Sequence, residues 1–253
     1  MTSEYRPTGY GVVLLAGATG RVGGAAIAEF ARRGAQLAVV SRSHENAVQA
    51  IQAHAPSIEP RDSMALEADL RVPAAAQAAV AAVVERFGRL DALVSLAGGG
   101  SPFVSIVDST FADVETSFRN NLGIAYNLSV AALRAMLAQT QLPHARSRGR
   151  LVCVTAGSSI VPQPRYGIMG AGKAGVNVLM RAIAREHKAD GIVANALVLG
   201  GVATEAARAY LNEAEFAAAA SPQEVADALA FHASDASSGI NGELIHLNAR
   251  ETD

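Results

Sequence analysis

Residues 12–23 read VVLLAGATGRVG, a short apolar run that leads directly into three evenly spaced glycines. The run Val12–Ala16 has the length and composition of a buried β-strand, and a helix-forming stretch follows the glycines. Gly17, Gly20 and Gly23 therefore stand at a strand-to-helix turn, the setting in which a glycine loop binds the pyrophosphate of a dinucleotide. The alternative interpretation is a tight turn without a ligand, because a glycine triplet alone is a weak signal.

Strand-like and helix-like stretches alternate along the whole chain. The predicted strands are Val12–Ala16, Leu37–Ser41, Ala92–Leu96, Leu151–Thr155 and Val193–Val198, and the predicted helices are Arg21–Arg33, Pro73–Phe87, Phe111–Gln139 and Gly170–Lys188. The strands are apolar throughout, which suits a parallel sheet covered on both faces. We therefore expect an α/β fold. Residues 1–253 would form a single Rossmann-type domain, with a doubly wound parallel sheet in a three-layer αβα arrangement.

Composition and charge exclude several classes of function. Of the 253 residues, 50% are hydrophobic and 17% are charged, and 21 basic against 23 acidic side chains give a net charge of −2. This balance gives no electrostatic reason to expect a nucleic acid or an anionic membrane as a partner. A single cysteine excludes an internal disulfide framework, the six histidines lack metal-ligand spacing, and no apolar run could span a bilayer. Because residues 1–11 also lack the apolar core of a secretory signal, we expect a cytoplasmic protein.

Two stretches are less regular than the rest. Gln139–Gly149 is polar, contains a proline and is predicted to be a surface loop. Gly200–Ser221 follows a strand and has a helical pattern, so Val202–Phe216 is either a lid over the ligand crevice or a plain surface helix. The apolar side chains expected around a substrate are Phe103, Val104, Tyr210, Leu211 and Phe216. A pocket of this kind suits a small, largely apolar substrate molecule.

Motifs after the glycine loop resemble those of the short-chain dehydrogenase/reductase family. The matching stretches are Asp69-Leu70, Ser95-Leu-Ala-Gly98, Asn121-Leu122, Asn195 to Thr204 and Ser238 to Ile245. The resemblance covers nearly the whole chain and implies an oxidoreductase that binds a nicotinamide dinucleotide. The cofactor contacts that it implies are Gly17, Thr19, Gly20, Arg21, Val22, Gly23, Ser41, Arg42, Asp69, Leu70, Ala97, Gly98, Lys173, Gly200, Val202 and Thr204.

The end of the second predicted strand favours NADP(H) over NAD(H). A carboxylate at this position would bind the ribose 2′-hydroxyl and repel a 2′-phosphate, but this chain has Ser41 followed by Arg42. A guanidinium matches the geometry of a phosphate, and Arg21 adds a second positive charge nearby. Both arginines could instead be solvated surface charges. Typical family members have threonine and glycine where this chain has Ala16 and Arg21, so only the spacing of the three glycines is intact.

The catalytic motif of the family is altered in this chain. The family uses a tyrosine four residues before a lysine, and a serine thirteen residues before the tyrosine. Lys173 matches the lysine, but the other two positions are Met169 and Ala156. Tyr166 lies seven residues before Lys173, which resembles the Tyr-x6-Lys segment of enoyl-acyl-carrier-protein reductases, a divergent branch of the family. In that branch the tyrosine hydroxyl stabilises negative charge on the carbonyl oxygen of the substrate.

Two hypotheses follow for the activity. In the first, Tyr166, Lys173 and Asn121 serve an NADP(H)-dependent reduction of a carbonyl, or of a C=C bond conjugated to one, and Thr155, Ser158 or Ser159 replaces the missing serine. In the second, the fold has lost hydride chemistry and the protein is an isomerase, lyase or cyclase, or an inactive binding subunit.

Several of these residues also have plain structural interpretations. Tyr166 could be an exposed loop aromatic, Asn121 an amide bonded to its own helix and Thr204 a helix cap, while Cys153 is expected to be buried in a strand. The family resemblance further implies a homotetramer or homodimer built on the long helices and the C-terminal segment.

Overall fold

The computed structural model describes residues 10–209 and 211–247, without the side chain of Arg21. It contains a seven-stranded parallel sheet in the order β3-β2-β1-β4-β5-β6-β7. The strands are β1 (Val12–Ala16), β2 (Gln36–Ser41), β3 (Ser63–Glu67), β4 (Ala92–Ser95), β5 (Gly149–Ala156), β6 (Ile192–Leu199) and β7 (Leu244–Leu247). The helices are α1 (Arg21–Arg32), α2 (His44–His54), α3 (Pro73–Phe87), α4 (Phe111–Phe118), α5 (Ile124–Ala138), α6 (Gly167–Glu186), α7 (Glu213–Ala218) and α8 (Pro222–His232).

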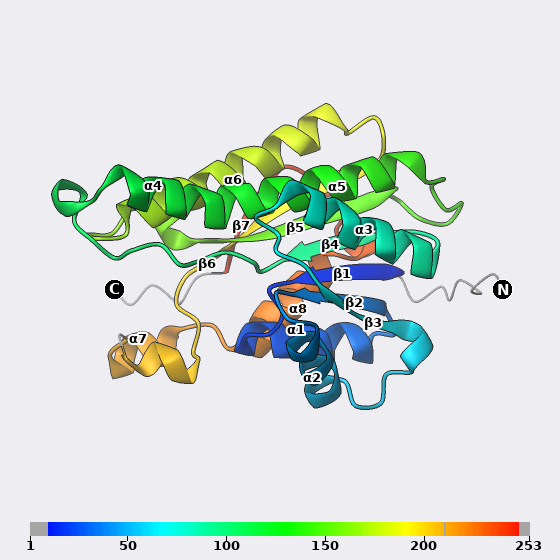
Figure 1. The fold of residues 1–253 in the computed structure, drawn as a ribbon, viewed down its shortest axis with the longest axis horizontal. Coiled ribbons are helices and arrows are strands. Elements are labelled where there is room, and N and C mark those ends of the chain that lie inside the picture. Colours follow the sequence, from blue (N-terminus) through cyan, green and yellow to red (C-terminus); the bar gives the residue numbers. More distant parts are fainter. Residues whose placement is uncertain (1–9, 210, 248–253) are drawn as a thin grey trace.

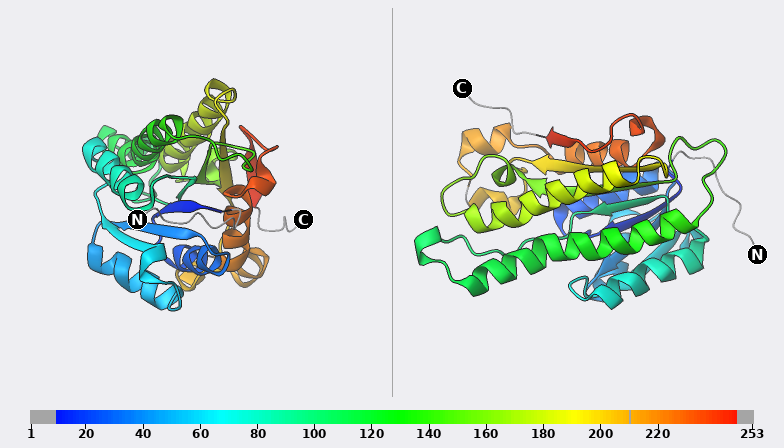
Figure 2. Two further views of the ribbon diagram at one scale, coloured as in Figure 1. Left: turned by 90° about the vertical axis from the view of Figure 1, so that its right-hand side faces the viewer. Right: turned by 90° about the horizontal axis from the view of Figure 1, so that it is seen from above.

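Helices cover both faces of the sheet, which confirms the predicted three-layer Rossmann-type fold (Figure 1). On one face, α3, α5 and α6 pack on alternate strand residues such as Leu14, Leu93 and Cys153. On the other face, α1, α2 and α8 pack on the intervening residues, such as Leu15 and Val94. Because successive strand residues point to opposite faces and both faces are buried, the central strands are apolar at every position. Figure 2 shows α5 and α6 running side by side along one face.

The edge strand β3 and the helices α2 and α8 were not predicted from the sequence. The outer strands β3 and β7 are only partly buried, so they lack the continuous apolar run by which the central strands were found. The stretch Ser238 to Ile245, which resembles the closing strand of the family, ends within β7, and the predicted loop at Gln139–Gly149 connects α5 to β5.

Two predicted helices also have different limits. The single helix predicted over Phe111–Gln139 consists of α4, a π-helical segment at Arg119–Gly123 and α5. The helix predicted from Gly170 begins at Gly167, directly after Tyr166. In residues 10–209 and 211–247, no helix is both long and apolar enough to cross a bilayer.

Candidate functional site

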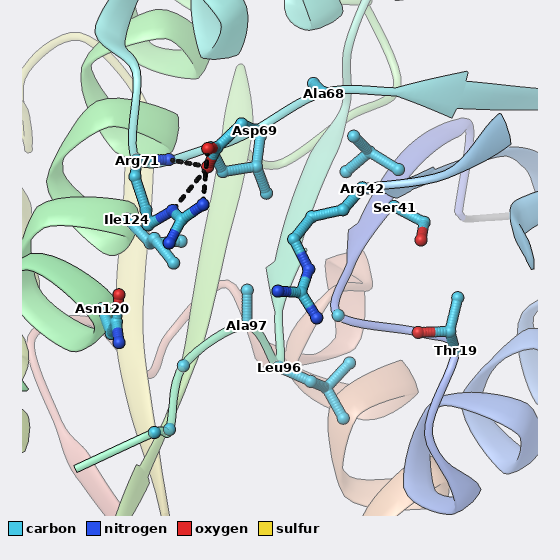
Figure 3. A pocket seen from close by; sticks show the side chains of 16 residues that line it. Thr19, Ser41, Arg42, Ala68, Asp69, Arg71, Leu96, Ala97, Asn120 and Ile124 are labelled. Atoms are coloured by element: carbon cyan, nitrogen blue, oxygen red, sulfur yellow. Dashed lines mark hydrogen bonds and ion pairs between the residues drawn. The ribbon is translucent and has the colours of Figure 1, made fainter.

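A cleft of about 370 Å³ opens at the carboxyl ends of β1 and β4, where the strand order changes direction (Figure 3). Such a switch point is where open parallel sheets bind ligands, because the loops that leave the two strands diverge there. The cleft is lined by the β1–α1 loop, the end of β2, the β3–α3 segment, the segment after β4 and the start of α5.

The three glycines of the first loop meet three different environments. Gly17 has a φ of +76°, and a Cβ there would lie 2.5 Å from the backbone N of Ala97. A Cβ on Gly23 would lie 2.3 Å from the Cα of Ala18, so this glycine lets α1 pack against the loop. Apart from its chain neighbours, no described residue has an atom within 4 Å of a Cβ placed on Gly20. Gly20 is also the N-cap of α1 and supplies no side-chain cap, and the first helical turn has no acidic residue.

The start of α1 is therefore suited to bind an anion. Its first N–H groups have no side-chain acceptor from the N-cap, and the helix dipole is positive at this end. Thr19 lines the cleft, whereas Val22 packs on the apolar cluster on the side of the sheet covered by α1. The sequence-predicted contact at the Arg21 side chain lies outside the described part of the structure.

Two arginines and one aspartate form the far end of the cleft. Arg42 follows Ser41 at the end of β2, and Figure 3 shows its guanidinium extending toward Leu96 and Ala97. Asp69 accepts hydrogen bonds from Arg71 Nε at 2.8 Å and Arg71 Nη2 at 2.7 Å. These bonds hold the pKa of Asp69 at about 2, below its ordinary value.

Arg71 is a cleft residue that the sequence reasoning missed. The signal was present, because an arginine two positions after a predicted cofactor contact lies within reach of the same ligand. The neighbouring Leu70 is buried, and its carbonyl accepts a hydrogen bond of 3.0 Å from Asn127 Nδ2 of α5.

The segment after β4 passes close to the two buried polar residues predicted to be catalytic. Gly98, Gly99 and Gly100 have φ values of +145°, +121° and +66°, which glycine adopts readily. A Cβ on Gly98 would lie 2.7 Å from Lys173 Nζ and 2.9 Å from Asn121 Oδ1. Glycine at this position therefore lets the main chain approach both side chains.

Asn121 crosslinks the π-helical segment to the loop after β4. Its Oδ1 accepts a hydrogen bond from Gly99 N at 3.0 Å, and its Nδ2 donates to Ser101 Oγ at 3.1 Å and to Ser117 O at 2.9 Å. A π-turn leaves backbone groups without their usual partners, and the amide satisfies one of them. These bonds match the structural interpretation of Asn121, since its side chain bonds back to its own helix.

Lys173 is a buried cation without a carboxylate partner among the described residues. Its Nζ donates to Val154 O at 3.1 Å. Burial lowers its pKa from 10.5 to about 8, and the nearby thiol of Cys153 opposes this shift. Cys153 is itself buried in β5, as predicted, and burial raises the pKa of its thiol to about 11.

Tyr166 is the N-cap of α6. Further along this helix, Lys173 bonds to Val154 O and Asn177 bonds to Ser159 Oγ at 2.8 Å. The seven-residue spacing between Tyr166 and Lys173 is nearly two full helical turns. The Tyr166 ring packs on Phe103 with the ring centroids 4.8 Å apart, and the residue is only partly exposed.

The three hydroxyls considered as replacements for the missing serine differ in their bonding. Ser159 Oγ is engaged, because it donates to Ala156 O at 2.6 Å and accepts from Asn177. Thr155 and Ser158 are buried, and neither hydroxyl has a hydrogen-bond partner among the described residues. Ser158 also lies against α6, since a Cβ on Gly170 would come within 2.4 Å of its carbonyl oxygen. Ser158 is therefore an available hydroxyl beside the helix that carries Tyr166 and Lys173.

The segment Val202–Phe216, expected to be either a lid or a plain surface helix, is joined by backbone contacts to Ala220, which follows it. Val202 and Ala220 form an isolated bridge, with Ala203 N bonded to Ala220 O at 2.8 Å. Thr204 Oγ1 accepts a bond of 3.3 Å from Ala207 N, which fits its interpretation as a cap. The Arg208 guanidinium lies 4.1 Å from the centre of the Phe216 ring. Phe216 thus packs within the segment itself, while Tyr210 lies outside the described residues.

Comparisons with known proteins agree on one family. A family model described as enoyl-(acyl carrier protein) reductase matches residues 17–249. The chain is 30% identical over 243 residues to an L-rhamnose 1-dehydrogenase (NAD(P)(+)) of Sphingomonas sp. (strain SKA58), covering 92% of each chain. It is 27% identical over 247 residues to the 3-oxoacyl-[acyl-carrier-protein] reductase FabG of Escherichia coli (strain K12), covering 94% of this chain and 95% of that one. The crystal structure of gox2181 superposes with a TM-score of 0.83 at 26% identity, covering 94% of both chains.

Proposed function

Since the chain belongs to the short-chain dehydrogenase/reductase family of oxidoreductases, we propose that it is an NADP(H)-dependent reductase. Its substrate is a small apolar molecule that carries a carbonyl group or a C=C bond conjugated to one. Tyr166 and Lys173 are the residues proposed to act on it.

The residues of the cleft fit a nicotinamide dinucleotide. The space beside Gly20 and the uncapped start of α1 suit a pyrophosphate, because no described residue beyond the chain neighbours of Gly20 comes within 4 Å of that position. Lys173 has three N–H groups and bonds to a single acceptor among the described residues, which leaves donors for ribose hydroxyls. The dinucleotide, when bound, supplies the hydride.

Preference for NADP(H) is supported by the end of β2. Ser41 replaces the carboxylate that would repel a 2′-phosphate, and the guanidinium of Arg42 extends into the cleft. A guanidinium can donate two parallel hydrogen bonds to a phosphate, so it favours the phosphorylated ribose over the plain one.

The observation that carries the reductase proposal is the position of Tyr166 at the N-cap of α6, about two helical turns before the buried Lys173. Met169 cannot transfer a proton, whereas the phenol of Tyr166 can donate one to a substrate oxygen. The buried ammonium of Lys173 favours negative charge nearby and so assists that donation. The free hydroxyl of Ser158 can steady the same oxygen.

The first experiment is a fluorescence or calorimetric titration with NADPH and, separately, with NADH. Tighter binding of NADPH is expected, and equal affinities would contradict the cofactor preference. Enals, enones and ketones are then screened by following NADPH oxidation. Tyr166→Phe should lower turnover by about 10²-fold or more, whereas Tyr126→Phe, on an exposed part of α5, should retain it. Full activity of Tyr166→Phe would exclude the proposed role of the phenol.

A second candidate is a member of the family without hydride chemistry. It is favoured by Ala156 and Met169, which stand where typical members have the serine and the tyrosine. This protein would be an isomerase, lyase or cyclase, or a binding subunit. Whether or not it binds the dinucleotide, it would not oxidise NADPH in the presence of any carbonyl or conjugated substrate. Tyr166→Phe would then leave dinucleotide binding unchanged.

A further inference from the structure

Three charged side chains lie together at the end of the cleft formed by β2 and the β3–α3 segment (Figure 3). They are Arg42, Asp69 and Arg71. Asp69 is the single carboxylate among the described residues that line the cleft. Glu67, at the end of β3, instead accepts a hydrogen bond of 2.9 Å from His44 N at the start of α2.

The carboxylate of Asp69 is held by Arg71 and not by Arg42. Both carboxylate oxygens are bonded to the Arg71 side chain, and Oδ1 also accepts a bond of 3.1 Å from the Arg71 backbone N. Arg42 interacts with Asp69 through space but makes no hydrogen bond or ion pair with a described residue. The guanidinium of Arg42 therefore remains available to a ligand.

Asp69 without its partner would oppose the binding of a phosphate. A free carboxylate near Arg42 would pair with that arginine and would also repel the negative charge of a 2′-phosphate. The two-pronged bond from Arg71 offsets the negative charge and fixes its position.

We propose that Arg71 is a specificity-determining residue, which holds Asp69 so that the guanidinium of Arg42 is free for the 2′-phosphate of NADP(H). This inference rests on the proposed use of NADP(H). It assigns the preference to a set of three side chains and not to Arg42 alone.

The test compares the dissociation constants of NADPH and NADH for variants of the whole protein. Arg71→Ala should weaken NADPH binding by about threefold to tenfold, the effect expected for one uncompensated charge at a partly screened distance. NADH binding should change less than twofold. Adding Asp69→Asn to Arg71→Ala should restore the ratio of the two affinities, because the uncompensated charge is then gone.

Arg86→Ala is the matched control. It removes the same charge from the opposite end of α3, and its exposed side chain bonds to the carbonyls of Pro60 and Arg61, far from the cleft. Arg86→Ala should leave the ratio of the NADPH and NADH affinities unchanged. The Asp69–Arg71 pair is itself partly exposed, at 40% and 43%, so its loss should cost little stability and the variants should fold.

The parent protein and Arg42→Ala separate failure of this inference from failure of the proposed cofactor. If the parent binds NADPH and NADH equally, the preference for NADP(H) itself is wrong. If the parent prefers NADPH but Arg42→Ala leaves the ratio of the two affinities unchanged, the role of Arg42 is wrong, and with it that of Arg71. If Arg42→Ala lowers the ratio while Arg71→Ala does not, or if Asp69→Asn fails to restore it, the role of Arg71 is wrong. A loss of affinity that is equal for both cofactors in Arg71→Ala would also overturn it.

Discussion

Lys173 lowers the free energy of unfolding of the protein, because its ammonium is buried without a carboxylate partner among the described residues. Its folded pKa of about 8 lies below the ordinary value of 10.5. Between these two pH values the unfolded chain binds more protons than the folded one, so the free energy of unfolding rises with pH across this window. Below pH 8 the full cost is present.

We therefore expect Lys173→Met to be more stable than the parent at pH 7, by on the order of 1–3 kcal/mol. The advantage should shrink as pH rises from 8 toward 10.5. Urea unfolding without cofactor, measured from pH 7 to pH 10, checks this. Lys188→Met, at an exposed position, is the control substitution for the loss of a lysine. If the difference in free energy of unfolding between Lys173→Met and the parent stays constant with pH, the pKa of Lys173 is the same in the folded and the unfolded protein.

The unpartnered hydroxyl of Ser158 leads to a second prediction at the residue scale. Ser158→Ala removes a buried polar group that has no hydrogen bond in the described structure, so stability should be unchanged or slightly higher. Turnover should fall by about tenfold to a hundredfold if the hydroxyl steadies the substrate oxygen. Ser147→Ala, at another buried and unpartnered serine, is the control for activity. Unchanged turnover in Ser158→Ala would assign the hydroxyl no part in the reaction.

At the scale of single residues, sequence could predict which side chains approach the site but not how they are bonded. Lys173, Asn121 and Asp69 were found from motif spacing. The bonding of Ser159, the freedom of Ser158 and the capture of Asp69 by Arg71 depend on contacts between segments far apart or on exact side-chain directions. Those contacts are properties of the packed molecule, so no local pattern encodes them.

At the scale of the element, two glycines at the start of α1 have different roles, since Gly20 is expected to serve cofactor binding and Gly23 to serve stability. Gly20→Ala adds a methyl group to open space, so the protein should unfold at nearly the same temperature as the parent. NADPH binding should weaken by about tenfold or more, because the backbone can no longer approach the phosphates. Gly23→Ala should instead lower stability by about 1–3 kcal/mol, since its Cβ would overlap the backbone of Ala18. Thermal unfolding and cofactor titration of both variants distinguish these outcomes, and normal binding by Gly20→Ala would place the phosphates elsewhere.

Strands and helices could be predicted from the sequence where their side chains are buried along the whole element, but not where part of the element is exposed. The five central strands are covered on both faces, so continuous apolar runs located them. The edge strand β3 and the helix α2 are half exposed, and their mixed composition hid them. The helix predicted over Phe111–Gln139 has no break at the π-helical segment, because an added residue in one turn leaves the helical pattern on either side unchanged. This segment is where Asn121 bonds to the loop after β4.

At the scale of the molecule, exposed apolar side chains on the long helices suggest self-association. Tyr126 on α5 is 53% exposed and Val178 on α6 is 67% exposed. We propose that these helices form the contact of a homodimer or homotetramer, as the family resemblance implies. Tyr126→Glu with Val178→Glu should then reduce the particle mass seen by light scattering, whereas Val107→Glu, on the loop before α4, should not. A parent protein that is monomeric at micromolar concentration would exclude this contact.

The burial of Cys153 in the middle of β5 makes the protein convenient for site-selective labelling. It is the one cysteine in the sequence, and its burial shields the sulfur from reagents in solution. Its raised pKa also means that little of the thiol is present as the reactive thiolate. A maleimide dye should therefore ignore the native protein and attach only to a cysteine introduced elsewhere. Val107→Cys, at a side chain 87% exposed, would accept one fluorophore on the loop before α4 without removal of the native thiol. In urea a second equivalent of dye would react with Cys153, so the amount of this second label would report the fraction of unfolded protein.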